Sequence, residues 1–160
     1  MSKKLTLSGI KESNKKYSQK KRVELSDGSH LFIYPHFSQP DQIELIKELI
    51  NNQTEAKNLG IKLEQINYSD WVLYNVVYKF ADLGIPKDLK KKIQCFHELI
   101  KYDCYGEIVK AFPLESIQGF QETVVNFQNN LTAVLKNEGI DLDEALEQVA
   151  DITKEDTIVQ

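Results

Sequence analysis

The 160-residue sequence has no run of about 18 apolar residues, the length that a membrane-spanning helix requires. It has two cysteines, too few for a disulfide framework, which favours a reducing compartment. The first residues, MSKKLTLSGIKESNKK, lack the apolar stretch and cleavage site of a secretory signal. From these absences we expect a cytoplasmic protein without a membrane partner.

Glycines are few and stand singly, so the sequence contains no glycine-rich loop that could hold phosphate. Residues 94–105, QCFHELIKYDCY, carry both cysteines and one of the three histidines. On a helix Cys95 and His97 would lie about 200° apart. His97 and Cys104 alone would not complete a structural zinc site, which takes four ligands, and a nucleophilic cysteine needs a neighbouring base. We therefore predict buried thiols and an exposed histidine, with no metal, cofactor or catalytic residues and no enzyme activity. The other two histidines, His30 and His36, are expected to be exposed.

The net charge of −4 conceals two oppositely charged ends. Residues 1–22 carry eight Lys or Arg against Glu12 alone, and residues 138–160 carry eight carboxylates against Lys154 alone. We predict a flexible basic arm over 1–22, a folded domain over 23–137, and an acidic segment over 138–160. Such ends are either solvated or in contact with a partner. In the second case the arm is a candidate nucleic-acid contact through Lys15, Lys16, Lys20, Lys21 and Arg22.

The hydrophobic pattern predicts a mainly α, single-domain helical bundle with a small N-terminal β-hairpin. In residues 23–34 apolar residues alternate with charged or polar ones on either side of Asp27-Gly28, a pair that is typical of a hairpin turn. Ser38 is a helix N-cap candidate, and residues 51–62 are predicted to be a polar connection. Residues 68–84 favour a helix with Ser69 as cap and Gly84 at its end, although a parallel strand over WVLYNVVY is an alternative.

Further helical segments are predicted along the rest of the chain. One begins near Pro86 and uses the apolar residues Leu89, Ile93, Phe96 and Ile100. A short amphipathic turn carries Ile108, Val109 and Phe112. A weak last helix is expected from Asp141, with Leu142, Leu146 and Val149 as its apolar side chains.

The most regular pattern lies in residues 114–136, where apolar residues alternate at spacings of three and four. They are Ile117, Phe120, Val124, Phe127, Leu131 and Val134. The pattern has two interpretations: packing inside a monomeric domain, or a docking surface for a helix of a second copy or of a partner. The other faces of this helix carry mainly uncharged polar residues, so a dimer formed through it would have little charge specificity.

Two segments resemble tail assembly chaperones of long-tailed bacteriophages. ELSDGSHLFIYPHFSQPDQIELIKELI resembles the start of these proteins, and YGEIVKAFPLESIQGFQETVVNFQNNL resembles their later part. The similarity covers about residues 23–135 and lies in element order and apolar pattern.

The resemblance implies a mostly helical phage or prophage protein that needs no cofactor and works in the bacterial cytoplasm. It would bind the helical tape-measure protein, keep it soluble during tail assembly, and tend to self-associate. Its candidate docking or self-association residues would be Ile117, Phe120, Val124, Phe127 and Leu131. The alternative is a nucleic-acid-binding or other regulatory interaction module that uses the basic arm.

Overall fold

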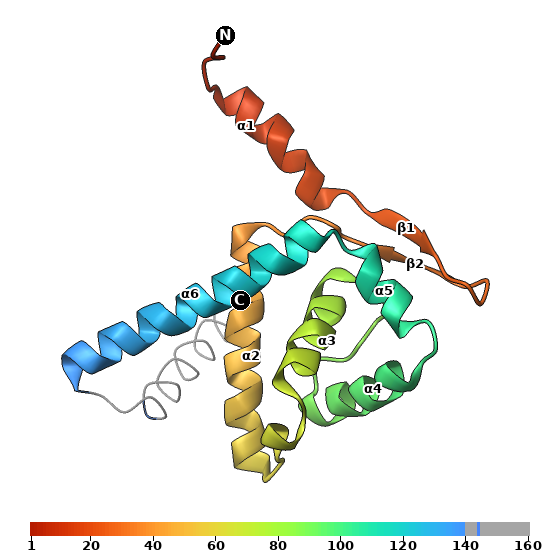
Figure 1. Ribbon diagram of the computed structural model, residues 1–160, viewed down its shortest axis with the longest axis vertical. Coiled ribbons are helices and arrows are strands. Elements are labelled where there is room, and N and C mark those ends of the chain that lie inside the picture. Colours follow the sequence, from red (N-terminus) through yellow and green to blue (C-terminus); the bar gives the residue numbers. More distant parts are fainter. Residues whose placement is uncertain (140–143, 145–160) are drawn as a thin grey trace.

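A computed structural model describes residues 1–139 and 144 of the chain. It confirms a mainly α fold with a small antiparallel N-terminal hairpin in one domain (Figure 1). The α-helices in the described part are α1 Leu7–Asn14, α2 Gln39–Leu59, α3 Tyr68–Phe80, α4 Leu89–Lys101, α5 Tyr105–Ala111 and α6 Leu114–Glu138. The strands are β1 Lys21–Glu24 and β2 His30–Ile33, and short 3-10 turns cover Lys15–Ser18 and Leu63–Gln65.

The hairpin forms around the predicted Asp27-Gly28 turn. Gly28 has φ of 86°, a left-handed conformation that favours glycine. The hairpin joins the helical body at the end of α3: the Tyr34 N–H donates to the Phe80 carbonyl at 2.8 Å, and the Asp82 N–H donates to the Phe32 carbonyl at 2.9 Å. These bonds attach the strands to the core-forming helices.

The N-terminal region contains a helix that the sequence did not predict. The Thr6 hydroxyl accepts a 3.1 Å hydrogen bond from the Gly9 N–H and caps α1. The segment predicted to be a flexible basic arm thus contains a helix, which this cap supports although the helix has little apolar periodicity. Strand β1 begins at Lys21, so Lys21 and Arg22 belong to the hairpin.

Helix α2 is longer than predicted. Ser38 caps it as expected, because its hydroxyl accepts from the Asp41 N–H. The predicted connection over 51–62 was wrong, since the helix continues to Leu59 and ends at Gly60 with φ of 69°. Asn52 and Ala56, spaced by four residues, are both buried, so the inward face persists through a stretch that is polar in sequence.

The segment YSDWVLYNVVYKF is helix α3, not a strand. Its cap is Asn67 rather than Ser69, because the Asn67 side chain accepts from the Asp70 N–H. The helix ends at Phe80, before the predicted Gly84, where the chain turns extended to pair with β2.

Helix α4 starts at Leu89 rather than near Pro86. Asp88 precedes it as cap, because its side chain accepts from the Lys91 N–H at 3.0 Å. Of the apolar side chains predicted on its inner face, Leu89 and Phe96 are buried, Ile93 is half-buried, and Ile100 is exposed.

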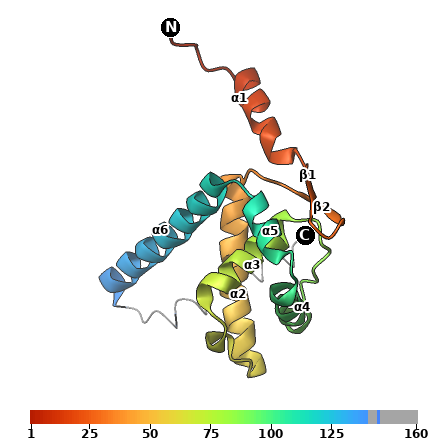
Figure 2. The same cartoon turned by 45° about the vertical axis from the view of Figure 1, so that its right-hand side comes forward.

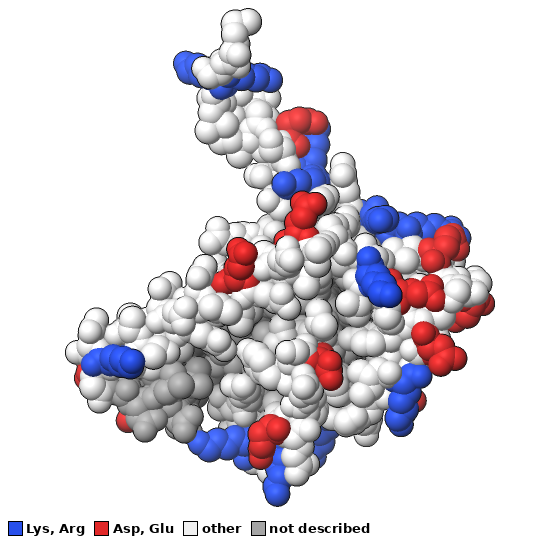
Figure 3. Space-filling model, viewed as in Figure 1, with Lys and Arg blue, Asp and Glu red and all other residues white. Residues whose placement is uncertain are grey.

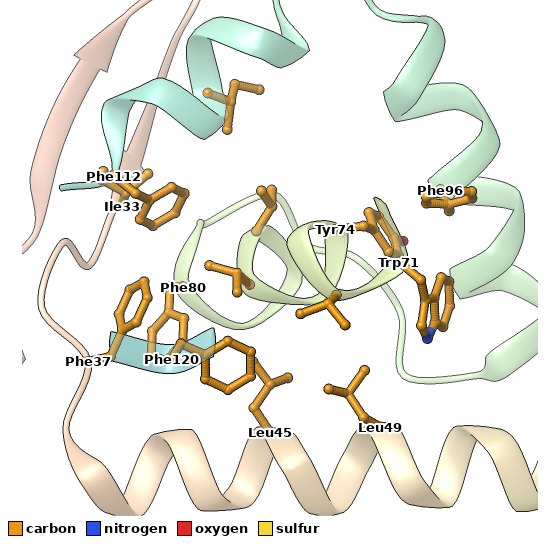
Figure 4. Packing of buried hydrophobic residues seen from close by; sticks show 14 of the residues in the cluster. Ile33, Phe37, Leu45, Leu49, Trp71, Tyr74, Phe80, Phe96, Phe112 and Phe120 are labelled. Carbon is orange, nitrogen blue, oxygen red and sulfur yellow. The ribbon is translucent and has the colours of Figure 1, made fainter. Parts of the chain in front are cut away.

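The core surrounds α3, with α2 on one side and α4 and α5 on the other, while α6 crosses α2 (Figures 1 and 2). Figure 4 shows its aromatic centre, in which Phe37 and Phe80 stack with ring centroids 3.8 Å apart. In the short helix α5 the predicted residue Ile108 is buried, as is Phe112 just after it, while Val109 is half-buried.

Helix α6 ends at Glu138, and Gly139 follows as its C-cap with φ of 68°. The weak helix expected from Asp141 and most of the acidic segment lie outside the described residues. Among the described helices, none combines the length and apolarity needed to cross a membrane.

Candidate functional site: a groove between α2, α3 and α6

The apolar side chains of α6 divide between the core and the surface. Phe120 is 0% exposed and Val124 is buried, so both pack inside the chain's own core. Ile117, Phe127 and Leu131 are half-buried. Val134, which continues the spacing, is 53% exposed. The first three of these positions belong to the core packing or its edge, as the packing interpretation predicts, while Phe127, Leu131 and Val134 keep part of their surface exposed.

The second half of α6 forms one wall of a groove of about 390 Å³. Helix α2 forms the other wall, and Tyr68 and Trp71 at the start of α3 close it at one side. The apolar lining consists of Ile46, Leu49, Ile50, Trp71, Val124, Phe127 and Leu131. Gln53, Gln128, Asn129 and Thr132 supply polar groups, and the described lining contains no charged residue.

A second hollow of about 810 Å³ adjoins the groove and shares Gln53, Tyr68 and Trp71 with it. It follows the end of α2 and the turn before α3. The two hollows together give an elongated concave surface beside α2, a shape that suits an extended or helical segment of another protein.

Polar contacts hold α6 against the rest of the domain. The Ser116 hydroxyl donates to the Pro35 carbonyl at 2.6 Å, and the Thr123 hydroxyl lies 2.9 Å from Gln42 Oε1 on α2. At the groove itself, Gln128 Nε2 donates to the Tyr68 hydroxyl at 3.2 Å. These hydrogen bonds join α6 to the segment before α2, to α2 itself and to α3. The groove is therefore a preformed feature of the fold.

Trp71 has an unsatisfied polar atom. Its indole N–H is buried and has no hydrogen-bond acceptor in the described part of the chain. A buried donor without a partner costs about 1–3 kcal/mol.

The outer surface of α6 carries few charges. Its solvent-facing side chains are mainly amides: Gln118, Gln121, Asn126, Gln128, Asn129 and Asn130. In Figure 3 the surface over α6 is largely uncharged, while Lys and Arg mark the projecting arm. Recognition at this face would therefore depend on shape and apolar contact more than on charge.

The cysteines and the histidine of the stretch 94–105 lie in different environments. Cys95 is half-buried, His97 is exposed, and Cys104 is buried. No group of three or more His, Cys, Asp or Glu that could hold a metal occurs among the described residues. His30 and His36 are exposed, as expected.

Cys104 instead lies beside a set of bonds that fix the hairpin turn. Its sulfur is 3.5 Å from the Ser26 hydroxyl. Ser26 donates to the Glu107 carboxylate through both its N–H, at 2.9 Å, and its hydroxyl. These bonds hold the pKa of Glu107 below its usual value. The arrangement ties the turn to α5 and is structural in character.

Asp27 makes the second attachment of the turn. It accepts bonds from the N–H and hydroxyl of Ser29 and from the Tyr102 hydroxyl. These donors lower the pKa of Asp27 to about 2.

The candidate nucleic-acid residues lie on or next to a projecting arm. Three of the five form ion pairs: Lys15 with Glu12 at 2.6 Å, Arg22 with Glu24 at 2.6 Å, and Lys20 with Asp82 at 3.6 Å. Lys16 lies over the Tyr17 ring, 5.1 Å from its centroid. The structure therefore does not gather these cations onto a single helix face.

Sequence reasoning missed Lys92. This lysine is 1% exposed, and its Nζ lies 3.8 Å from the Tyr78 ring centroid and 5.7 Å from that of Trp71. Burial lowers its pKa to about 8, against the opposing attraction of Glu48 and Glu55. The available signal was its position, three residues after Leu89 and four before Phe96, which places it on the inward face of α4.

Comparison with known proteins identifies the family. The YomO family model matches residues 7–160. The chain belongs to the YomO family. A relative from Bacillus subtilis (strain 168), named "SPbeta prophage-derived uncharacterized protein YomO", is 40% identical over 121 residues, which are 76% of this chain and 73% of the relative. No solved structure matches the chain.

Proposed function

We propose that this YomO-family chain is a phage or prophage protein. The relative whose name describes it as prophage-derived is 40% identical over 121 residues, which supports this origin. We further propose that it is a non-enzymatic tail assembly chaperone in the bacterial cytoplasm, where it binds the helical tape-measure protein and keeps it soluble.

The observation that carries the chaperone proposal is the preformed apolar groove beside α2. A helix with apolar residues at spacings of three and four can insert them between Leu49 and Ile50 of α2 and Phe127 and Leu131 of α6. The absence of charge in the described lining fits a client whose exposed stripes are apolar. Weak contacts repeated along a long helix would add up by multivalency.

The proposal assigns the client contacts to those apolar residues of α6 that are not fully buried. Phe120 and Val124 belong to the core, so a partner would meet Phe127 and Leu131, with Ile117 at the edge of the core packing. A chaperone of this kind needs no reactive side chain, and the burial of Cys104 is compatible with that.

The test is co-expression with the tape-measure protein of the phage or prophage that encodes this chain, followed by affinity capture. We expect capture by the wild type and loss of capture by the double variant Phe127→Glu/Leu131→Glu. The matched control is Val125→Glu, because Val125 is exposed on the same helix and does not line the groove. Circular dichroism and thermal unfolding of each variant confirm that the fold is kept.

Two results would contradict the proposal. One is a well-folded wild type that captures nothing. The other is capture by the groove variant equal to that of the control.

Nucleic-acid binding is the second candidate, favoured by the basic arm that projects from the body (Figure 3). It predicts affinity for DNA or RNA that falls steeply with salt. Charge reversal at Lys16 and Lys21 would abolish such binding, whereas the groove variant would retain it.

A further inference from the structure

Strand β1 forms an open edge of the two-stranded sheet. Strand β2 lies between β1 and the helical body, where Ile33 forms a bridge with Ala81 (Figure 1). Within the described part of the chain, no other strand pairs with the outer side of β1. An exposed strand edge presents unpaired backbone donors and acceptors, so it is a surface to which another strand can add.

The alternation of hydrogen bonds along β1 identifies the free backbone groups. The Leu25 N–H donates to the Ser29 carbonyl at 2.9 Å, so Leu25 directs its backbone groups towards β2. Successive residues of an antiparallel strand alternate between the two sides. Val23 therefore also directs its backbone groups towards β2, while the N–H and C=O groups of Arg22 and Glu24 point away from the sheet.

The side chains of this edge carry one charge of each sign, on either side of a central valine. Arg22 and Glu24 are exposed, with 55% and 64% of their side-chain surface accessible, and Arg22 Nε donates to Glu24 Oε1 at 2.6 Å. Val23 lies between them and is half-buried on the opposite face of the strand. The edge is therefore complementary to a reversed copy of itself.

The charges select one antiparallel register for two copies of β1. In the register centred on Val23, Arg22 of each copy lies opposite Glu24 of the other, and the outward backbone groups of these two residues meet. A register centred on Arg22 or on Glu24 places two identical charges opposite each other, which is destabilising. A shift by a single position turns the inner face of one strand to the outer face of the other.

The same register brings opposite charges together at the ends of the contact. Antiparallel pairing places the start of β1 in one copy, with the basic arm before it, beside the hairpin turn of the other copy. That turn contains Asp27 and is bonded to the Glu107 carboxylate. Figures 1 and 2 show that α1 extends beyond the start of β1, so the arm leaves the edge of the strand uncovered.

We propose that two copies of this chain associate through β1, which joins their hairpins into one antiparallel sheet in the order β2–β1–β1–β2. Val23 lies at the twofold axis, and each of the two Arg22–Glu24 pairs exchanges backbone hydrogen bonds. On the outer face the four side chains form a ring of alternating charge. The contact uses the same surface on both copies and therefore closes at the dimer. Because it involves few residues, the association is weak and depends on concentration.

This surface is separate from the groove of the proposed function. The groove lies between α2, α3 and α6, and no residue of β1 is among its described lining. The groove variant Phe127→Glu/Leu131→Glu should therefore lose the client and still self-associate like the wild type. Variants of the strand edge should lose self-association and still capture the client, so the failure of one proposal leaves the other standing.

The experiment is sedimentation equilibrium of the full-length protein without any client, over a wide range of concentration and at low and high salt. We expect wild-type self-association that weakens with salt. Arg22→Glu and Glu24→Arg should each raise the dissociation constant at least about tenfold, because like charges then face each other across the strands. The matched control is Lys90→Glu, which makes the same change of charge at an exposed position on α4 and should associate like the wild type.

Two further samples test the register. The charge-swapped variant Arg22→Glu/Glu24→Arg restores opposite charges across the strands and should associate like the wild type. An equimolar mixture of Arg22→Glu with Glu24→Arg should form a one-to-one complex, because the acidic edge of the first then faces the basic edge of the second. Both side chains are exposed, and circular dichroism with thermal unfolding confirms that each variant is folded.

Three outcomes would overturn the inference: a wild type that stays monomeric up to about 1 mM, single charge variants that associate like the wild type, or a mixture that stays monomeric. Self-association that is lost in the groove variant and kept in the edge variants would also overturn it, because the contact would then lie on α6.

Discussion

Replacing Lys92 by methionine should stabilise the protein at neutral pH. Lys92 is 1% exposed, and its ammonium lies against the rings of Tyr78 and Trp71. Methionine has a similar length and no charge, so it keeps most of the packing while removing the cost of burying an ion.

The magnitude follows from two opposing effects. Burial lowers the Lys92 pKa from 10.5 to about 8, which corresponds to about 3 kcal/mol of penalty on the charged form. The aromatic faces of Tyr78 and Trp71 offset about 2 kcal/mol of this through cation–π attraction. The difference predicts that Lys92→Met raises the free energy of unfolding by about 1 kcal/mol, or the Tm by about 3 °C.

The stabilising effect of Lys92→Met should depend on pH. Below about pH 8 Lys92 is charged in both states, so the full penalty is present. As the pH rises from about 8 towards 10.5, the folded protein loses the proton first and the wild type gains stability. The advantage of Lys92→Met should therefore shrink over that range.

The assay is urea unfolding followed by circular dichroism, at neutral pH and again above pH 8. Lys90→Met is the matched control, since Lys90 is exposed on the same helix and its replacement should change stability by less than about 0.5 kcal/mol. A Lys92→Met variant that is less stable than the wild type at neutral pH would refute the reasoning. A stability difference that does not vary with pH would refute the role of the buried charge.

Further predictions concern the core, the hairpin turn and the helix caps. Phe120→Ala should lower the free energy of unfolding by about 3–5 kcal/mol, and the half-buried Phe127→Ala by clearly less, as measured by urea unfolding. The Asp27 pKa of about 2 lies below its ordinary 3.8, so its stabilising contribution is complete above about pH 4 and lost as the pH falls towards 2. Thermal unfolding should show a Tm that falls over this range, with a smaller fall in Asp27→Asn. Ser38→Ala should cost about 1 kcal/mol of global stability, whereas Thr6→Ala should leave global unfolding unchanged because α1 has no buried residue. Equal losses in the two variants would contradict the separation of the arm from the core.

Where the apolar pattern was strong, the sequence predicted the fold correctly. The helix α3 and the regular spacing in α6 have enough apolar residues at helical intervals to determine their conformation locally. The hairpin was predicted because Asp27-Gly28 needs the left-handed conformation that Gly28 adopts.

The errors lie where tertiary contacts or caps decide the outcome. Helix α2 continues through NNQTEAKNL because Asn52 and Ala56 face the core, and neither residue type signals burial in a sequence. The cap of α3 is Asn67 rather than Ser69, a choice between two residues with nearly equal capping preference. Burial of Lys92 could not be predicted from residue type, because lysines are almost never buried without a partner.

The groove, too, could not be predicted from the local sequence pattern, because it arises from the way α6 packs against the rest of the chain. Helical spacing puts Phe120 and Phe127 on one side of α6, and the sequence treats them as equivalent. Their environments differ because α6 crosses α2 at an angle, so that its first half packs in the core while its second half diverges and leaves the groove (Figures 1 and 2). The crossing is set by the Pro35–Ser116 and Gln42–Thr123 contacts, which join residues 81 positions apart and have no signature in either local segment. A binding surface made in this way is a property of the folded chain, and variants at Phe127 or Leu131 can test it at a smaller cost to the core than variants at the fully buried Phe120.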